Sequence, residues 1–141
     1  ESLGGGVATQ LAAYASRQGE TPRALVLQAT FSSLVDAAGY HYPWLPVRWL
    51  MIDRFESAAA MPDVTCPILH VHGTADEIVP FALGQQLFAA APAKSHTGVP
   101  KRFVELPGEG HNNIDRAPFS EFGQAVASFL NQISQPPVSV E

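Results

Sequence analysis

Three segments of the sequence place a serine, an aspartate and a histidine beside glycines, in that order along the chain. Ser2 stands near the start, Asp76 follows one short apolar run, and His111 follows another. A serine hydroxyl is a poor nucleophile near neutral pH, so a base must take its proton. A histidine can take and return that proton, and a carboxylate can fix the histidine tautomer. These residue types predict acyl transfer through a serine nucleophile.

Backbone groups beside Ser2 suit the same chemistry. The peptide N–H of Leu3, at the start of a predicted helix, is well placed to stabilise an oxyanion. Gly4 is expected to let the backbone pack closely at the sharp turn that exposes the Ser2 hydroxyl. The ordinary alternatives are that Ser2 caps a helix and that Asp76 is a turn residue.

Other side chains compete for the acid and base roles. Glu77 is the nearest competitor of Asp76, and Asp36 is interpreted as part of a helix start that follows Ser33. The rivals of His111 are His41, His70, His72 and His96. His70 and His72 alternate within one predicted strand, so they share a face and could in principle bind a metal. No third ligand accompanies them, and no metal site is predicted.

Strands and helices must bring these residues together. Short apolar runs predict strands buried on both faces at residues 23–29, 67–73 and 102–106. Helical periodicity predicts helices from Gly6 to about Gly19, over 81–91 and over 119–133. This alternation is typical of an α/β fold with a mostly parallel sheet and crossover helices. Because ligands bind at the carboxyl ends of such strands, the residues that follow them are expected to meet.

Residues 31–66 are too many for a simple crossover. They are interpreted as a small helical lid above the sheet, made of one or two short helices. Tyr40, Trp44 and Trp49 within it are candidates for lining a substrate pocket, and the equal alternative is that they form the core of the lid. Cys66 is expected to be a buried, inert thiol. Residues 134–141 are expected to be a frayed tail.

Composition excludes several classes of function. The net charge of -5 gives no reason to expect a nucleic-acid partner. No apolar run approaches the roughly 18 residues of a membrane span. With 46% hydrophobic and 15% charged residues the chain can bury a core. A single cysteine rules out an internal disulfide and leaves the redox compartment open.

Three motifs resemble one family. Residues 1–5 (ESLGG) look like the end of the Gly-x-Ser-x-Gly nucleophile elbow with one further glycine. Residues 72–80 (HGTADEIVP) and 107–112 (PGEGHN) resemble the acid loop and the histidine loop of α/β-hydrolases. The likeness is strongest to abhydrolase-domain serine hydrolases, which include depalmitoylase-like and serine-aminopeptidase-like members. It extends to about Ile133 and covers the second half of that family's domain.

The resemblance implies that residues 1–133 are the C-terminal half of an α/β-hydrolase domain, with Ser2 as nucleophile, Asp76 as acid and His111 as base. The substrate would be a small-molecule, acyl or peptide ester, thioester or amide, and no cofactor is needed. The first elbow glycine, the preceding strand and the second oxyanion donor are expected upstream. A membrane anchor could also lie there, so localisation is left open between cytoplasmic and membrane-associated.

Two other interpretations stay open. One is a non-catalytic hydrolase-like binding module or an inactive fragment, since a fold does not guarantee activity. The other is different chemistry on the same fold, such as a dehalogenase-like reaction. That reaction usually needs a carboxylate at the elbow, where this chain has Ser2.

Overall fold

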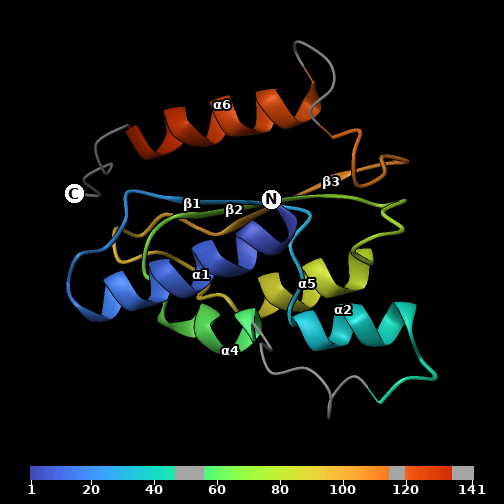
Figure 1. Cartoon of the computed structure of the whole chain (residues 1–141). Helices are drawn as coiled ribbons and strands as arrows, with labels where there is room; N and C mark the ends of the chain where they lie inside the picture. The colour runs from blue at the N-terminus through green and yellow to red at the C-terminus, as the bar shows by residue number, and fades with distance from the viewer. Residues whose placement is uncertain (47–55, 115–119, 135–141) are drawn as a thin grey trace.

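A parallel sheet lies at the centre of the molecule, with helices on both of its faces (Figure 1). The computed structural model describes residues 1–46, 56–114 and 120–134. Its elements are α1 (Ser2–Arg17), β1 (Leu25–Gln28), α2 (Leu34–His41), α4 (Ser57–Ala60), the 3-10 helix η1 (Met61–Asp63), β2 (Ile68–Gly73), α5 (Phe81–Ala90), β3 (Arg102–Leu106) and α6 (Glu121–Ser134). The predicted α/β alternation is confirmed.

The strands of this sheet run in the order β1-β2-β3, and both pairings are parallel. Val26 is level with Leu69, and Val71 is level with Val104. The carboxyl ends of all three strands therefore lie at one edge of the sheet, as the sequence predicts. β2 is buried along its whole length. The prediction that β3 is also buried on both faces is wrong, because β3 lies at the end of the described sheet and exposes Glu105.

Two apolar layers cover the faces of the sheet. α6 lies on one face, where Ala125 and Phe129 pack in a cluster with Leu69, Val71 and Leu106. α1, α4 and α5 lie on the other face (Figure 1). Their cluster joins residues of these helices to both β1 and β2 and includes Ala13, Leu27, Met61, Ile68 and Leu87. The sheet is thus held rigidly between helices, as a site at its edge requires.

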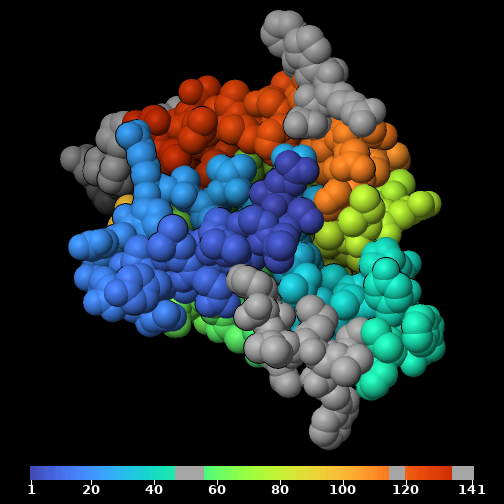
Figure 2. Space-filling model, in the orientation of Figure 1, coloured from blue at the N-terminus to red at the C-terminus, as the bar shows by residue number. Residues whose placement is uncertain are grey.

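Helix α1 packs through its small residues. Its buried positions are Gly5, Gly6, Thr9, Ala12 and Ala13. The large apolar residues whose spacing predicts the helix, Val7, Leu11 and Tyr14, are each at least half exposed. Figure 2 shows α1 in dark blue on the surface of the molecule. The helix is confirmed, but the face that packs on the sheet is the one that lets its backbone approach closely. The predicted stop at Gly19 is also confirmed, because Gly19 has a φ of 79° just after α1 ends.

The segment between β1 and β2 starts with a capped helix. The Ser33 hydroxyl accepts hydrogen bonds from the N–H groups of Val35 and Asp36, which confirms the predicted helix start. Farther along, α4 and η1 pack against α1 and place Ala60 and Met61 in the core. Trp49 and most of the predicted tail, residues 135–141, lie outside the described residues.

His70, in the middle of β2, is buried without a hydrogen bond. It has no solvent exposure, and neither ring nitrogen has a partner among the described residues. The ring packs against Phe103 and His72, with centroid distances of 5.1 and 5.6 Å. Burial lowers the pKa of His70 to about 3, because the imidazolium cannot be solvated there, and the neighbouring His72 adds to the effect. His70 is therefore neutral in the folded chain.

We expect this residue to make the fold acid-labile between pH 6.5 and about 3. There the unfolded chain binds a proton at His70 that the folded chain does not. Stability from this group is complete above pH 6.5 and falls with decreasing pH, by about 1.4 kcal/mol per pH unit. The lowered pKa of His72 acts in the same direction.

Urea unfolding at several pH values from 7 to 4 measures this effect. His70→Phe should flatten the pH dependence of the unfolding free energy, while His96→Gln, at an exposed histidine, serves as the control for loss of an imidazole. An unchanged slope in a folded His70→Phe protein would contradict the assignment.

Candidate active site

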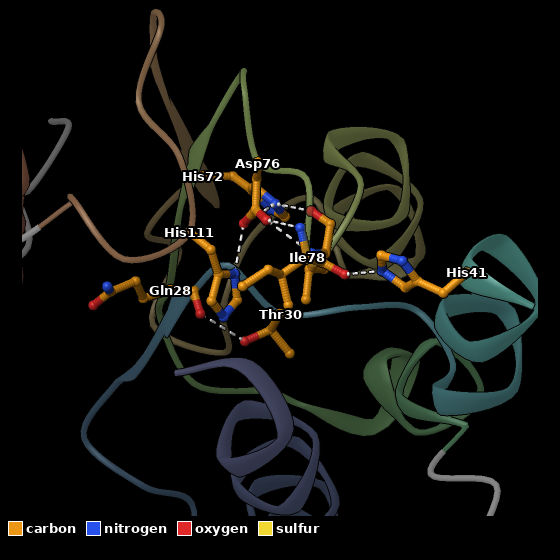
Figure 3. A network of polar contacts seen from close by, with 8 residues as sticks. Gln28, Thr30, His41, His72, Asp76, Ile78 and His111 are labelled. Carbon is orange, nitrogen blue, oxygen red and sulfur yellow. Dashed lines mark hydrogen bonds and ion pairs between the residues drawn. The ribbon is translucent and has the colours of Figure 1, made fainter.

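Asp76 and His111 form a buried pair at the carboxyl edge of the sheet. Asp76 Oδ2 accepts a hydrogen bond from His111 Nδ1 at 2.7 Å. The Asp76 side chain is fully buried, and His111 is 9% exposed. A carboxylate can only accept, so Nδ1 carries the proton and Nε2 is left with a lone pair. In Figure 3 the ring points away from Asp76 toward Thr30.

Asp76 is held by the loop that it begins. Its other oxygen, Oδ1, accepts from the backbone N–H groups of Ile78 at 2.9 Å and Val79 at 2.8 Å. A short aspartate side chain suits this turn, because it can bond to backbone groups two and three residues ahead. The competitor Glu77 is exposed. These donors hold one oxygen of the carboxylate and direct the second oxygen at His111.

Gly73 allows the two loops to approach each other. A Cβ atom at this position would lie 2.2 Å from the carbonyl oxygen of Glu109. The same carbonyl accepts a hydrogen bond from the N–H of Ala75 at 3.0 Å. The glycine at the end of β2 thus lets the backbone before His111 lie directly against the acid loop.

Ser2 is the first residue of α1 and has a strained backbone. Its φ is 47°, in the left-handed region that non-glycine residues rarely adopt, at a typical cost of about 1–3 kcal/mol. Leu3 follows in the first helical turn, where N–H groups have no acceptor within the helix. Among the described residues, no hydrogen bond joins the Ser2 hydroxyl to His111.

A glycine contact brings this end of α1 to the same edge of the sheet. A Cβ at Gly5 would lie 2.0 Å from Thr30 Oγ1, and Thr30 follows the carboxyl end of β1. A Cβ at Gly4 would meet nothing within 4 Å among the described residues. The close approach expected at Gly4 is therefore made by Gly5.

The candidate substrate residues Tyr40 and Trp44 are exposed. Tyr40 and Trp44 are 63% and 77% exposed, so they do not form a packed lid core within the described residues, and Trp49 lies outside them. A cavity of about 350 Å³ opens between α2, α4 and α5, but Ser2, Asp76 and His111 do not line it. The role of the three aromatic residues stays a prediction.

Two further histidines touch the acid loop and were missed as partners of the site. His41, on α2, has Nε2 2.7 Å from the carbonyl oxygen of Ile78, and His72 has Nε2 3.0 Å from the carbonyl oxygen of Val79. The sequence signal for His72 is its place directly before Gly73 and four residues before Asp76. His41 has no such signal, because its contact spans 37 positions.

Neither the Cys66 thiol nor a metal-binding cluster adds to the site among the described residues. Cys66 is buried, and burial raises the pKa of its thiol to about 11, so it is a poor nucleophile. Within residues 1–46, 56–114 and 120–134, no three His, Cys, Asp or Glu side chains gather as a metal site would need. None of the helices in those ranges has the length and hydropathy to cross a bilayer.

The family of the chain follows from its sequence match. Residues 2–109 match the family described as serine hydrolase (FSH1). The chain belongs to this serine hydrolase family. The match begins at Ser2 and includes Asp76, while His111 lies just beyond it.

Curated relatives of this serine hydrolase chain are longer proteins. An uncharacterized protein of Mycobacterium tuberculosis is 39% identical over 132 residues, which cover 94% of this chain and 43% of that protein. The lysophosphatidylserine lipase ABHD12 of Danio rerio is 34% identical over 134 residues, covering 83% of this chain and 35% of the lipase. The chain thus spans less than half of the length of these relatives.

Solved structures place the serine hydrolase chain in the α/β-hydrolase fold. A monoacylglycerol lipase of Paleococcus ferrophilus superposes with a TM-score of 0.56 at 18% identity, covering 94% of this chain and 66% of the lipase. An enol-lactonase of Burkholderia xenovorans gives a TM-score of 0.59 at 21% identity, covering 92% of this chain and 63% of that enzyme. The sheet and helices described above correspond to part of that fold.

Proposed function

We propose that this chain forms the C-terminal part of a serine hydrolase domain whose catalytic residues are Ser2, His111 and Asp76. The observation that carries the proposal is the buried 2.7 Å hydrogen bond from His111 Nδ1 to Asp76 Oδ2. It fixes the tautomer in which His111 Nε2 can accept a proton. The strained φ of Ser2 at the start of α1 adds support, because nucleophile elbows expose their serine on such a turn.

The proposed reaction gives each of the three residues one role. Ser2 Oγ attacks the substrate carbonyl carbon while His111 Nε2 takes the hydroxyl proton. The negative charge on the carbonyl oxygen is stabilised by the N–H of Leu3 and the positive end of α1. The intermediate then collapses, and His111 returns the proton to the leaving alcohol, thiol or amine. Water attacks the acyl-enzyme by the same route and releases the acid.

The longer relatives support a site completed by residues outside this chain. An oxyanion hole normally uses two donors, and Leu3 supplies one. Losing one donor typically lowers the rate by about 10²–10³-fold. The chain covers 43% and 35% of the two relatives named above, which leaves room for further strands and for the second donor.

For the substrate we propose the carboxylic ester of an acyl lipid. The support is the 34% identity to a protein named as a lysophosphatidylserine lipase, which is higher than the identity to any solved structure named here. Tyr40 and Trp44 are exposed on the segment after β1, and we propose that their side chains contact the acyl chain.

Labelling with a fluorophosphonate tests the serine directly. We expect the probe to attach to Ser2 in the serine hydrolase that contains this chain, and we expect Ser2→Ala to abolish labelling. The matched control is Ser128→Ala, at an exposed serine of α6, which should label like the parent. A folded protein that does not label would favour a non-catalytic binding module, whereas labelling at another serine would show that Ser2 is not the nucleophile.

A further inference from the structure

We infer that His72 is a positioning residue that holds Asp76 in the orientation in which it fixes the His111 tautomer. The inference rests on the proposed function, because it concerns the acid and base of that site. Among the other charged and titratable side chains, its environment is set by Asp76, His111 and His70. His72 lies in β2 and has no solvent exposure.

The contacts of His72 fix its own protonation. Its Nε2 is 3.0 Å from the carbonyl oxygen of Val79 and 3.4 Å from Asp76 Oδ2 (Figure 3). A carbonyl oxygen can only accept, so Nε2 must carry the hydrogen. This N–H donates to Val79 and also presents its positive end to the Asp76 carboxylate.

The other ring nitrogen keeps His72 neutral. Nδ1 is buried without a hydrogen-bond partner among the described residues. It lies against α5, where a Cβ at Gly84 would be 2.1 Å away. A proton on Nδ1 would be an unsatisfied buried donor, and burial accordingly lowers the pKa of His72. The residue therefore presents an N–H dipole to Asp76 and does not place a cation beside His111.

Val79 connects His72 to the acid. Its N–H donates to Asp76 Oδ1 at 2.8 Å, while its carbonyl accepts from His72 Nε2. Both backbone polar groups of Val79 are therefore hydrogen-bonded. The N–H donates to the Asp76 carboxylate, and the carbonyl accepts from His72 in β2. Without His72 the carbonyl would be released, and the turn that aims Asp76 Oδ2 at His111 could rotate.

A purely structural role for His72 predicts a different outcome. A core residue that only fills space would change stability when replaced by a ring of similar size, but it would leave the tautomer of His111 unchanged. Replacing a positioning residue would change the tautomer of His111 even when the variant still folds. Glutamine can place an amide N–H near the position of His72 Nε2, so it should restore the contact that phenylalanine removes.

Nitrogen NMR of ¹⁵N-histidine-labelled chain measures both tautomers. In the parent we expect His72 as the neutral Nε2–H form and His111 as the Nδ1–H form. His72→Phe should give a mixture of His111 tautomers, and His72→Gln should return most of the Nδ1–H form. Gly84→Ala should resemble His72→Phe, because its Cβ displaces the ring. Gln85→Ala, at an exposed position of the same helix, is the control.

Two results would overturn the inference. One is a folded His72→Phe protein whose His111 keeps the parent tautomer. The other is a parent chain in which His72 carries its proton on Nδ1. This second result is measured on the unmodified sequence, so misfolding of a variant cannot explain it. Neither readout involves Ser2, so the inference can fail while the proposed nucleophile stands, and the reverse also holds.

Kinetics of the serine hydrolase give an independent readout. We expect His72→Phe to lower kcat by about 10-fold or more with little change in KM, as for loss of other outer-shell partners. His72→Gln should recover most of this loss. An equal fall in both variants would indicate that only packing matters, and it would count against the positioning role.

Discussion

Ser2→Ala is expected to lower kcat for ester hydrolysis by about 10⁴-fold or more in the serine hydrolase that contains this chain. Alanine removes the attacking oxygen, and His111 is then left with no hydroxyl to deprotonate. KM should change little, because the side chain that is lost is small. Initial rates with an acyl ester such as a p-nitrophenyl ester measure the effect, and burst kinetics report loss of the acyl-enzyme.

Ser2→Gly separates the loss of the hydroxyl from damage to the fold. Glycine accepts the 47° φ of this position without strain, so we expect it to be at least as stable as Ser2→Ala in urea unfolding. Both variants should nevertheless be inactive. Turnover near the parent rate in either would show that Ser2 is not the nucleophile.

The sheet could be predicted from the sequence because parallel strands that are buried on both faces are short, nearly continuous apolar runs. β2 is apolar apart from two histidines, and it is bounded by Pro67 and Gly73. The same reasoning failed for β3, whose run carries the charged residues Arg102 and Glu105 and whose place at the end of the described sheet leaves Glu105 exposed. Position within a sheet depends on contacts that a short run does not encode.

The packing face of α1 could not be predicted from periodicity alone. Val7, Leu11 and Tyr14 have helical spacing, yet the helix packs through Gly5, Thr9 and Ala13. Small residues bring the helix axis close to β1, and Gly5 meets Thr30 directly. A hydrophobicity pattern gives weight to large side chains and therefore favours the opposite face.

The proximity of Asp76 and His111 could be predicted because each residue follows a strand end. Parallel pairing brings such positions to one edge, and the Asp76–His111 hydrogen bond is the result. The residues that hold this pair in place could not be predicted in the same way. Gly73 makes room for the Glu109 backbone, Gly84 makes room for the His72 ring, and His72 contacts the carbonyl oxygen of Val79, seven residues away. Only folded backbone geometry reveals such contacts.

Asp76→Asn is expected to lower kcat by about 10⁴-fold, although the side chain keeps its shape. The Ile78 and Val79 N–H groups hold one oxygen in place, so the amide oxygen must take the Oδ1 position. The amide NH₂ then replaces Oδ2 and faces the Nδ1–H of His111, which sat 2.7 Å from that oxygen. His72 Nε2–H also points there, from 3.4 Å.

Two donors cannot face each other, so His111 should shift its proton to Nε2. That nitrogen then loses the lone pair that would accept the Ser2 proton, and the general base is gone. Nitrogen NMR should report the Nε2–H tautomer of His111 in the folded variant. Glu77→Gln, the same chemical change at the exposed neighbour, should keep both parent activity and the Nδ1–H tautomer. An active Asp76→Asn protein would assign the acid elsewhere, whereas inactivity with the parent tautomer would mean that the carboxylate acts through its charge alone.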